Sequence, residues 1–400
     1  MLKQLSYRVF HINELLFSTL YPLRKPIHIK SIDEIPQRIK AYGFDSVLLV
    51  TGPHINKIGL TTPLKQALEK EGINYILYDK TSSNPTTANV NEAYELYIRN
   101  QCDAIIGFGG GSPIDCAKAV GIRSALPKAS LEMLQGAFLI KKKMPPIFAI
   151  PTTAGSGSEV SIASVITDEE KKKKYFIADP CLVPRFVYID PHYTLLQPKL
   201  SSMYCAMDAL SHAIESDLSL ASTRGTRYNS KKAIRLIYGN IDKVYEDSTN
   251  YKARRNLCIA SYSAGLAFTR SYVGYIHALA HALGGAYNIP HGKAIAVIMP
   301  HVLEYYSRYI PRRIKRIAIA ANIADKTTPA DLACRMLIDS LYDMLDRYEI
   351  GRYIEELKVD DIKKLAHNAA QEANPLYPVP VIMDQKQLER ILIDVLLFRG

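Results

Sequence analysis

The chain has no CxxC pair, no long apolar run, and neither an internal repeat nor a low-complexity linker. Its six cysteines are scattered, which argues against a disulfide framework or a thiolate zinc site and fits a reducing compartment. No stretch reaches the roughly eighteen apolar residues of a transmembrane helix. Polar residues also interrupt the N-terminal apolar pattern, where a signal peptide needs a continuous core. We therefore expect a cytoplasmic protein without a membrane span.

A formal net charge of +11 could indicate a nucleic-acid or membrane partner. However, the basic runs are short, at Lys141–Lys143 and Lys171–Lys174, and neither is interleaved with aromatic residues. The second run directly follows an acidic one, Asp168–Glu170. We predict solvated turns, and neither nucleic acid nor a membrane as a partner.

The two halves of the chain carry different periodicities. Residues 46–50, 73–78 and 103–108 are strand-like, and helical patterns at 64–71 and 90–100 separate them, which predicts a parallel, Rossmann-like sheet. From about residue 201 onward, helix-period stretches dominate. We predict an α/β dinucleotide-binding domain over residues 1–198 and an all-helical, metal-binding and catalytic domain over residues 199–400.

A glycine-rich turn follows the last of these strands. Gly109, Gly110 and Gly111 allow close backbone approach to a ligand, and Ser112 is expected to be the N-cap of the following helix, with Asp115 as the acid of a capping box. A phosphate bound there would meet free N–H groups and the positive end of the helix dipole. The turn is neither G-x-G-x-x-G nor a Walker loop, so a purely structural turn is the alternative.

Another strand end, at residues 148–151, leads into a loop of small hydroxyl and glycine residues that begins with Thr152 and Thr153. Such a loop offers hydrogen-bond donors to a nucleotide. It could equally be an ordinary polar loop.

Three imidazoles crowd into about fifteen residues of the second half. His277 and His281 share one helix face, and His291 can return from the next element. A second pair at helical spacing, Asp208 and His212, could add a carboxylate. We predict a metal site, with buried core histidines as the alternative. The spacing alone leaves open which imidazoles bind and which metal is held.

Taken together, these motifs resemble the iron-containing, group III alcohol dehydrogenases, over nearly the whole chain from about residue 25. The resemblance implies one divalent metal ion, Fe(2+) or else Zn(2+) or another divalent ion, held by Asp208, His212, His277 and His291. It leaves His281 as a non-ligand beside the substrate.

The resemblance also implies where a nucleotide binds. Gly110, Gly111 and Ser112 would cradle the pyrophosphate. The remaining positions would be Thr152 and Thr153 at the nicotinamide half, Asn84 near the adenosine, and Lys174 at the nicotinamide ribose.

The implied function is a metal-dependent alcohol dehydrogenase or aldehyde reductase, which transfers hydride between a primary alcohol or aldehyde and NAD(P). His281 is expected to relay a proton to water, since an imidazole titrates near neutral pH, although it could merely pack. Phe268 is expected to line the substrate pocket, with core packing as the alternative. A homodimer is the family-level expectation. A zinc-dependent polyol (glycerol-type) dehydrogenase and a dehydroquinate-synthase-like lyase are the alternatives, but the motifs at Gly109 and His277 favour the alcohol dehydrogenases.

One position departs from the family's pattern. Family members that use NAD commonly carry Asp after the first strand's Thr, where it accepts from the ribose 2′-hydroxyl and repels a 2′-phosphate. Here the residue is Gly52. We therefore predict use of NADP(H), either preferred or shared with NAD(H), unless Gly52 serves only the turn.

Overall fold

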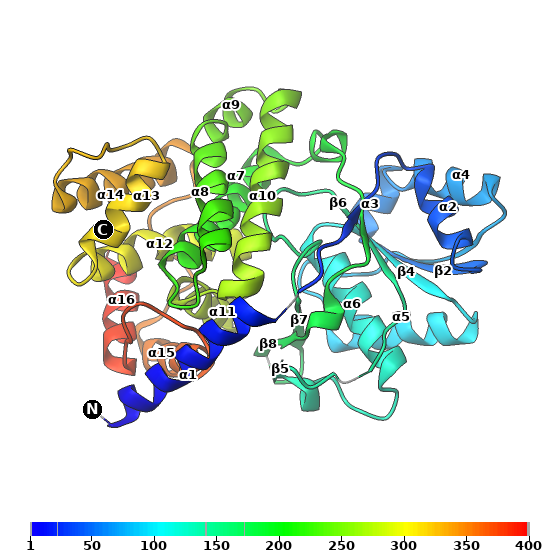
Figure 1. Ribbon diagram of the computed structural model, residues 1–400, viewed down its shortest axis with the longest axis horizontal. Helices are drawn as coiled ribbons and strands as arrows, with labels where there is room; N and C mark the ends of the chain where they lie inside the picture. The colour runs from blue at the N-terminus through cyan, green and yellow to red at the C-terminus, as the bar shows by residue number, and fades with distance from the viewer. Residues whose placement is uncertain (1, 22, 141, 172, 398–400) are drawn as a thin grey trace. The chain divides into compact units, whose positions relative to one another are not determined.

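The computed structural model describes residues 2–21, 23–140, 142–171 and 173–397. The chain divides into two compact units, Leu23–Gln197 and a second that combines Met1–Pro22 with Pro198–Gly400 (Figure 1). Residues 1–22 thus belong with the helical unit, whereas the sequence analysis assigned them to the α/β domain. Lys141 and Lys172 of the basic runs lie outside the described residues.

The α/β unit contains a six-stranded sheet with the order β1-β9-β6-β4-β2-β3, in which every pairing is parallel. The strands are β1 (Ile27–His28), β2 (Ser46–Val50), β3 (Asn74–Tyr78), β4 (Ala104–Gly109), β6 (Ile147–Pro151) and β9 (Phe186–Val187). This confirms the predicted parallel sheet. In the register of β4 and β6, Gly109 lies opposite Pro151, so the glycine turn and the Thr152 loop leave the sheet side by side.

Helices cover both faces of this sheet because its strands are apolar on both sides. On one face Leu48 and Ile105 pack with residues of α5 (Thr87–Arg99) and α6 (Gly111–Ala125). On the other face Val47 and Ile106 pack with residues of α2 (Glu34–Lys40) and α4 (Thr62–Lys70). The alternation of strand residues between the two cores is the two-residue period expected of strands.

A second, smaller sheet was not predicted. It has the order β5-β8-β7, with β5 (Gly136–Ala137), β7 (Ala163–Asp168) and β8 (Lys173–Ala178), and β7 and β8 form an antiparallel hairpin. The hairpin presents Lys174 on β8.

The second unit is built from helices, which confirms the predicted all-α architecture, and the described residues from 198 onward contain no strand. Its helices are α1 (Leu2–Leu20), α7 (Lys199–Leu218), α8 (Arg224–Tyr238), α9 (Ile241–Glu246), α10 (Tyr251–Ser271), α11 (Tyr275–Tyr287), α12 (His291–Ser307), α13 (Pro311–Ala320), α14 (Ala330–Arg347), α15 (Ile362–Ala373) and α16 (Gln385–Leu397). Helix α7 is buried over most of its length and packs against α8, α10 and α12. Nowhere in the described ranges is a helix long and apolar enough to cross a membrane.

Candidate metal centre and nucleotide-binding turn

Three helices of the second unit bring the predicted metal ligands together. Asp208 and His212 lie one turn apart on the buried helix α7, His277 lies on α11, and His291 is the first residue of α12. Gly292 explains the close approach of α12, because a Cβ there would lie 2.4 Å from the Tyr204 carbonyl oxygen on α7. Only glycine lets the start of α12 press against α7.

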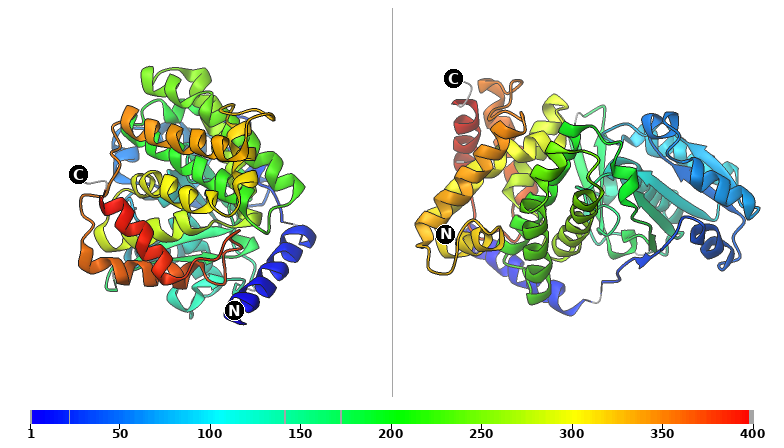
Figure 2. Two further views of the ribbon diagram at one scale, coloured as in Figure 1. Left: turned by 90° about the vertical axis from the view of Figure 1, so that its left-hand side faces the viewer. Right: turned by 90° about the horizontal axis from the view of Figure 1, so that it is seen from above.

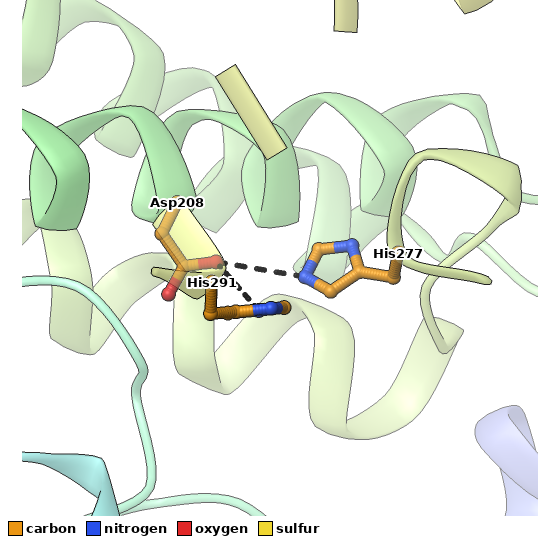
Figure 3. Close-up of side chains that lie close together, drawn as sticks. All are labelled: Asp208, His277 and His291. Carbon is orange, nitrogen blue, oxygen red and sulfur yellow. Dashed lines mark ion pairs between the residues drawn. The ribbon is translucent and has the colours of Figure 1, made fainter. Parts of the chain in front are cut away.

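The candidate ligand atoms lie near Asp208 Oδ1, and those of Asp208, His277 and His291 form the tightest group. Asp208 Oδ1 lies 3.5 Å from His291 Nε2, 3.7 Å from His277 Nε2 and 3.8 Å from His212 Nδ1. One ligand atom each of Asp208, His277 and His291 lies within 4.8 Å of the others (Figure 3). These separations are long for hydrogen bonds, but two donors of a tetrahedral ion with bonds near 2.1 Å lie about 3.4 Å apart. His212 adjoins this tight group, with its ring centroid 4.4 Å from that of His277.

Several buried polar atoms of this cluster have no hydrogen-bond partner in the described parts of the chain. They are Asp208 Oδ1, His212 Nδ1 and His277 Nε2. Burying even one polar atom without a hydrogen-bond partner lowers the stability of a fold, so buried polar groups are nearly always paired. Three such atoms, two of them in the tight group of Asp208, His277 and His291, fit a bound cation. One carboxylate with three imidazoles suits iron(II) or zinc.

The electrostatics hold most of these groups in their metal-binding forms. Burial acts to raise the pKa of Asp208, but His212 and His291 hold it well below its usual range. Burial lowers the pKa of His212 to about 3 and of His291 to about 4. For His277, burial acts to lower the pKa, but the nearby carboxylates of Asp208 and Glu215 raise it to about 9. A cation that binds must therefore displace a proton from His277.

Glu215 supports His277 in the cluster, and the sequence analysis did not single it out. It is buried; its Oε2 lies 2.6 Å from His277 Nδ1, and its Oε1 accepts from the Ile276 N–H at 2.8 Å. A carboxylate on the far nitrogen fixes the tautomer and orientation of a ligating imidazole. The sequence contained a signal for this residue. Asp208, His212 and Glu215 follow the i, i+4, i+7 spacing of one helix face, so Glu215 could have been placed beside the candidate ligands.

His281 and Phe268 also border the cluster. His281 Nδ1 lies 2.7 Å from Glu372 Oε1, which also accepts from the Tyr377 hydroxyl at 2.8 Å. The ring of His281 stacks near that of His291, with centroids 5.3 Å apart. The ring of Phe268 stacks on His212 with centroids 4.2 Å apart. No spacing in the sequence could have paired His281 with Glu372, 91 positions later.

The start of α6 differs from the prediction. The helix begins at Gly111 with the extended Gly110 as N-cap and without a side-chain cap, so Ser112 lies inside the helix and its hydroxyl donates to the Ser83 carbonyl at 2.5 Å. Asp115 is not a capping-box acid either. Its buried carboxylate accepts from the Ser158 hydroxyl at 2.9 Å and from the Val165 N–H at 3.0 Å. Because the helix begins at Gly111, Asp115 lies too far along it to serve as the capping-box acid. Its carboxylate instead binds Ser158 of the neighbouring loop.

That loop packs tightly against the glycine turn. Thr152 N–H donates to the Gly109 carbonyl at 2.9 Å. A Cβ on Gly110 would lie 3.4 Å from the Thr153 side chain, and a Cβ on Gly111 would lie 2.8 Å from the hydroxyl of Ser156. The structure thus brings the three glycines together with Thr152 and Thr153, beside the free N–H groups of the α6 N-terminus.

The other predicted nucleotide residues lie in the same unit. Lys174 Nζ donates to Asn84 Oδ1 at 2.7 Å, and burial lowers the pKa of this lysine to about 8. Gly52 is the extended N-cap of α3 (Pro53–Lys57), with φ at −98°. A Cβ there would meet only the Thr81 carbonyl oxygen, at an ordinary 3.5 Å, so the turn does not require glycine.

Comparison with known proteins gives consistent matches along the chain. Residues 26–191 match the family model of the iron-containing alcohol dehydrogenases, and residues 202–396 match the C-terminal model of the same family. The chain is 35% identical over 366 residues to alcohol dehydrogenase 4 of Saccharomyces cerevisiae, which covers 90% of this chain and 94% of that protein. It is 35% identical over 349 residues to 1,3-propanediol dehydrogenase of Citrobacter freundii, covering 86% and 90%. The crystal structure of a 1,3-propanediol oxidoreductase superposes with a TM-score of 0.89 at 29% identity, covering 94% of this chain and 100% of that one.

Proposed function

Because this chain belongs to the iron-containing alcohol dehydrogenase family, we propose that it binds one divalent metal ion through Asp208, His212, His277 and His291. The chain is an oxidoreductase that transfers hydride between an alcohol or aldehyde and a nicotinamide coenzyme, and this reaction replaces the lyase alternative. The observation that supports the ligand set most strongly is the close grouping of Asp208, His277 and His291. Beside it, His212 adds another buried atom without a hydrogen-bond partner in the described chain. Iron(II) is the family's metal, and zinc is the alternative that the same donors suit.

Held by these residues, the ion would supply Lewis acidity toward the substrate oxygen. The chain's own residues prepare this chemistry. The carboxylate of Asp208 adds negative charge to the imidazole donors, and Glu215 orients His277 so that Nε2 faces the cluster. We assign His281 to proton exchange with water at Nε2, because its Nδ1 is occupied by Glu372. Phe268 covers one face of His212 and presents an apolar wall.

For the coenzyme, we propose that Gly109, Gly110, Gly111 and Ser112 hold the pyrophosphate. Thr152 and Thr153 would hold the nicotinamide half, with Asn84 near the adenosine and Lys174 at the nicotinamide ribose. Their grouping around the α6 N-terminus supports this assignment, because free N–H groups and the helix dipole favour phosphate there. Asp115 contributes indirectly, since one of its oxygens holds the loop at Ser158 and the other accepts from the Val165 N–H on β7.

NADP(H) is the proposed coenzyme, either preferred or shared with NAD(H). The support is that Gly52 lacks the carboxylate that repels a 2′-phosphate while its backbone has room for a side chain. The test is butanal-dependent oxidation of NADPH and of NADH by wild type, Gly52→Asp and Gly52→Asn. We expect the aspartate to lower kcat/KM for NADPH at least about tenfold and the uncharged asparagine to have a small effect. Wild-type activity with NADH alone, or an unchanged preference in Gly52→Asp, would refute this assignment.

We further propose a cytoplasmic homodimer that acts on a small primary alcohol or aldehyde. No disulfide joins the six cysteines, all of which the structure describes, and this supports a reducing compartment. The names of the relatives above, an alcohol dehydrogenase and a propanediol dehydrogenase, support a small alcohol.

A further inference from the structure

Helix α1 lies at the edge of the helical unit (Figure 2) and is fastened to the loop between α15 and α16. Arg8 Nη1 and Nη2 donate to the carbonyl oxygens of Val379 and Pro380 at 2.7 and 3.0 Å. The buried His11 places Nε2 3.0 Å from the carbonyl oxygen of Pro375. Two side chains of α1 therefore hold three carbonyl groups of this loop.

The sequence of this loop, residues 374–384, explains why it depends on donors from outside. Pro375, Pro378 and Pro380 have no backbone N–H, which limits the hydrogen bonds that the loop can make within itself. The carbonyl oxygen of Pro378 accepts from the Leu220 N–H at 2.7 Å, and those of the other two prolines are held by α1. We therefore expect the position of the loop to depend on the docking of α1.

The same loop supports the partner of His281. Tyr377, a buried loop residue, donates its hydroxyl to Glu372 Oε1 at 2.8 Å, and His281 Nδ1 lies 2.7 Å from the same oxygen. In the chain, Tyr377 lies between Pro375 and Val379, the residues whose carbonyl groups contact α1. A displaced loop would withdraw the Tyr377 hydroxyl from Glu372. That carboxylate would then be free to rotate, and His281 would lose its fixed orientation.

Helix α1 precedes the part of the chain that the family models match, which begins at residue 26. His281, Glu372 and Tyr377 lie inside the part matched by the C-terminal model, residues 202–396. A segment outside the family's pattern thus contacts a loop inside it. The matched residues alone assign no role to α1.

We infer that Arg8 is a positioning residue for His281 and acts through the α15–α16 loop. By holding two loop carbonyl groups, Arg8 keeps the hydroxyl of Tyr377 on Glu372. The hydrogen bond that one imidazole nitrogen makes decides which nitrogen exchanges a proton, so Glu372 leaves Nε2 of His281 for that exchange. This inference rests on the proposed role of His281 in the reaction.

The first test compares Arg8→Met with a matched variant, Arg24→Met, in butanal reduction by the metal-loaded enzyme. Arg24 Nε and Nη2 also donate to backbone carbonyl oxygens, those of Val183 and Cys181, but they do so in the α/β unit. Arg8→Met should lower kcat/KM for butanal about three- to tenfold. Its metal content and its KM for the coenzyme should stay at wild-type values, and Arg24→Met should keep full activity. Full activity of Arg8→Met would overturn the inference.

A double-mutant cycle with Tyr377→Phe separates positioning from a general loss of stability. Phenylalanine keeps the buried ring and removes the hydroxyl that reaches Glu372. In the Tyr377→Phe background, Arg8→Met should lower kcat/KM little further, whereas its effect on the melting temperature should be the same as in wild type. If the two substitutions instead lower kcat/KM by independent factors, Arg8 does not act through Tyr377.

Hydrogen exchange of metal-free protein tests the first step of this route without any turnover. The N–H groups of Tyr377 and Val379 donate to the carbonyl oxygens of Ala373 and Tyr377 at 2.7 Å each. Protection of these two amides should fall in Arg8→Met and stay unchanged in Arg24→Met. Unchanged protection in Arg8→Met would overturn the inference.

His281→Asn distinguishes failure of the inference from failure of the proposed function. If His281→Asn loses activity and Arg8→Met does not, the inference alone is wrong. Full activity of His281→Asn would refute the proposed role of His281 and, with it, the role of Arg8 as its positioning residue.

Discussion

Two clusters of buried charged groups, one in each unit, differ in how completely their hydrogen bonds are satisfied. In the α/β unit, Lys118 Nζ donates to the Ser161 carbonyl at 2.9 Å, to the Ser161 hydroxyl at 3.0 Å and to the Ala163 carbonyl at 2.8 Å. Nearby, both oxygens of Asp115 accept hydrogen bonds. In the helical unit, Asp208 Oδ1 and His277 Nε2 are equally buried but have no such partner within the described chain.

The difference separates a structural cluster from a ligand site. Three donors and three acceptors complete the Lys118 network, so it anchors the start of β7 to α6 and has no capacity left for a ligand. The Asp208 cluster keeps its acceptors directed at a common point, and a cation would satisfy them together. Burial and charge alone would not have told these clusters apart.

The largest expected effect comes from Asp208→Asn, which keeps the shape of the side chain and removes its charge. Loss of the metal should lower kcat/KM about a thousandfold or more, while the melting temperature of metal-free protein changes little. Elemental analysis of the purified variant gives the metal content alongside the kinetics. If Asp208→Asn still held one ion per chain, the Asp208 cluster would not be the metal site that distinguishes it from the Lys118 network.

Lys118→Met should act on stability instead. The substitution leaves the Asp115 and Glu159 carboxylates without their buried cation. The free energy of unfolding, measured with urea, should therefore fall by about 3–5 kcal/mol. Metal affinity should stay at the wild-type value. Lys80→Met removes a lysine whose side chain is 70% exposed and should cost less than about 0.5 kcal/mol; equal losses in the two variants would contradict the structural role of Lys118.

Glu215→Gln tests how far metal binding depends on the contact between the Glu215 carboxylate and His277 Nδ1. The amide cannot hold the Nδ1 proton of His277 as a carboxylate does, so metal affinity should fall about 10- to 100-fold. Competition with a chelator of known affinity measures this directly. Glu304→Gln, on a different helix of the same unit, serves as the control, and an unchanged affinity in Glu215→Gln would show that His277 needs no such orientation.

The smallest effect concerns His11, a buried residue of α1. Burial and then the neighbouring Arg8 lower the pKa of His11 to about 4, against 6.5 for the free side chain. The folded state therefore favours neutral His11, and its stabilisation is complete above pH 6.5 and is lost as pH falls toward 4. The protection factors of the α1 amides, which correct for the intrinsic pH dependence of exchange, should fall between pH 7 and pH 5 in wild type and less so in His11→Gln. Equal pH dependence in both proteins would show that another group controls the docking.

The sequence predicted those parts of the site that depend on local periodicity. Helical spacing paired Asp208 with His212 and His277 with His281, and the same periodicity already contained Glu215. The contact between His281 and Glu372 depends on the packing of α11 against α15, which no local pattern encodes. The N-cap prediction for Ser112 was wrong because the preceding glycines allow the helix to begin at Gly111.

In the fold, too, features that depend on local sequence patterns were predicted, and features that depend on contacts between distant residues were not. Apolar strand and helix periods predicted the parallel sheet and the helical unit. They missed the hairpin of β7 and β8, whose strands carry charged and hydroxyl residues. They also missed that residues 1–22 join the helical unit, because that placement depends on Arg8 and His11 reaching carbonyl oxygens more than 360 positions away.

The most direct test is an anaerobic titration of metal-free protein with iron(II) during butanal reduction by NADPH or NADH. Activity should rise linearly and stop at one ion per chain, and Asp208→Asn should stay inactive throughout. Full activity of wild type before any metal is added, or equal activation of Asp208→Asn, would contradict the assignment of the Asp208 cluster as the catalytic metal site.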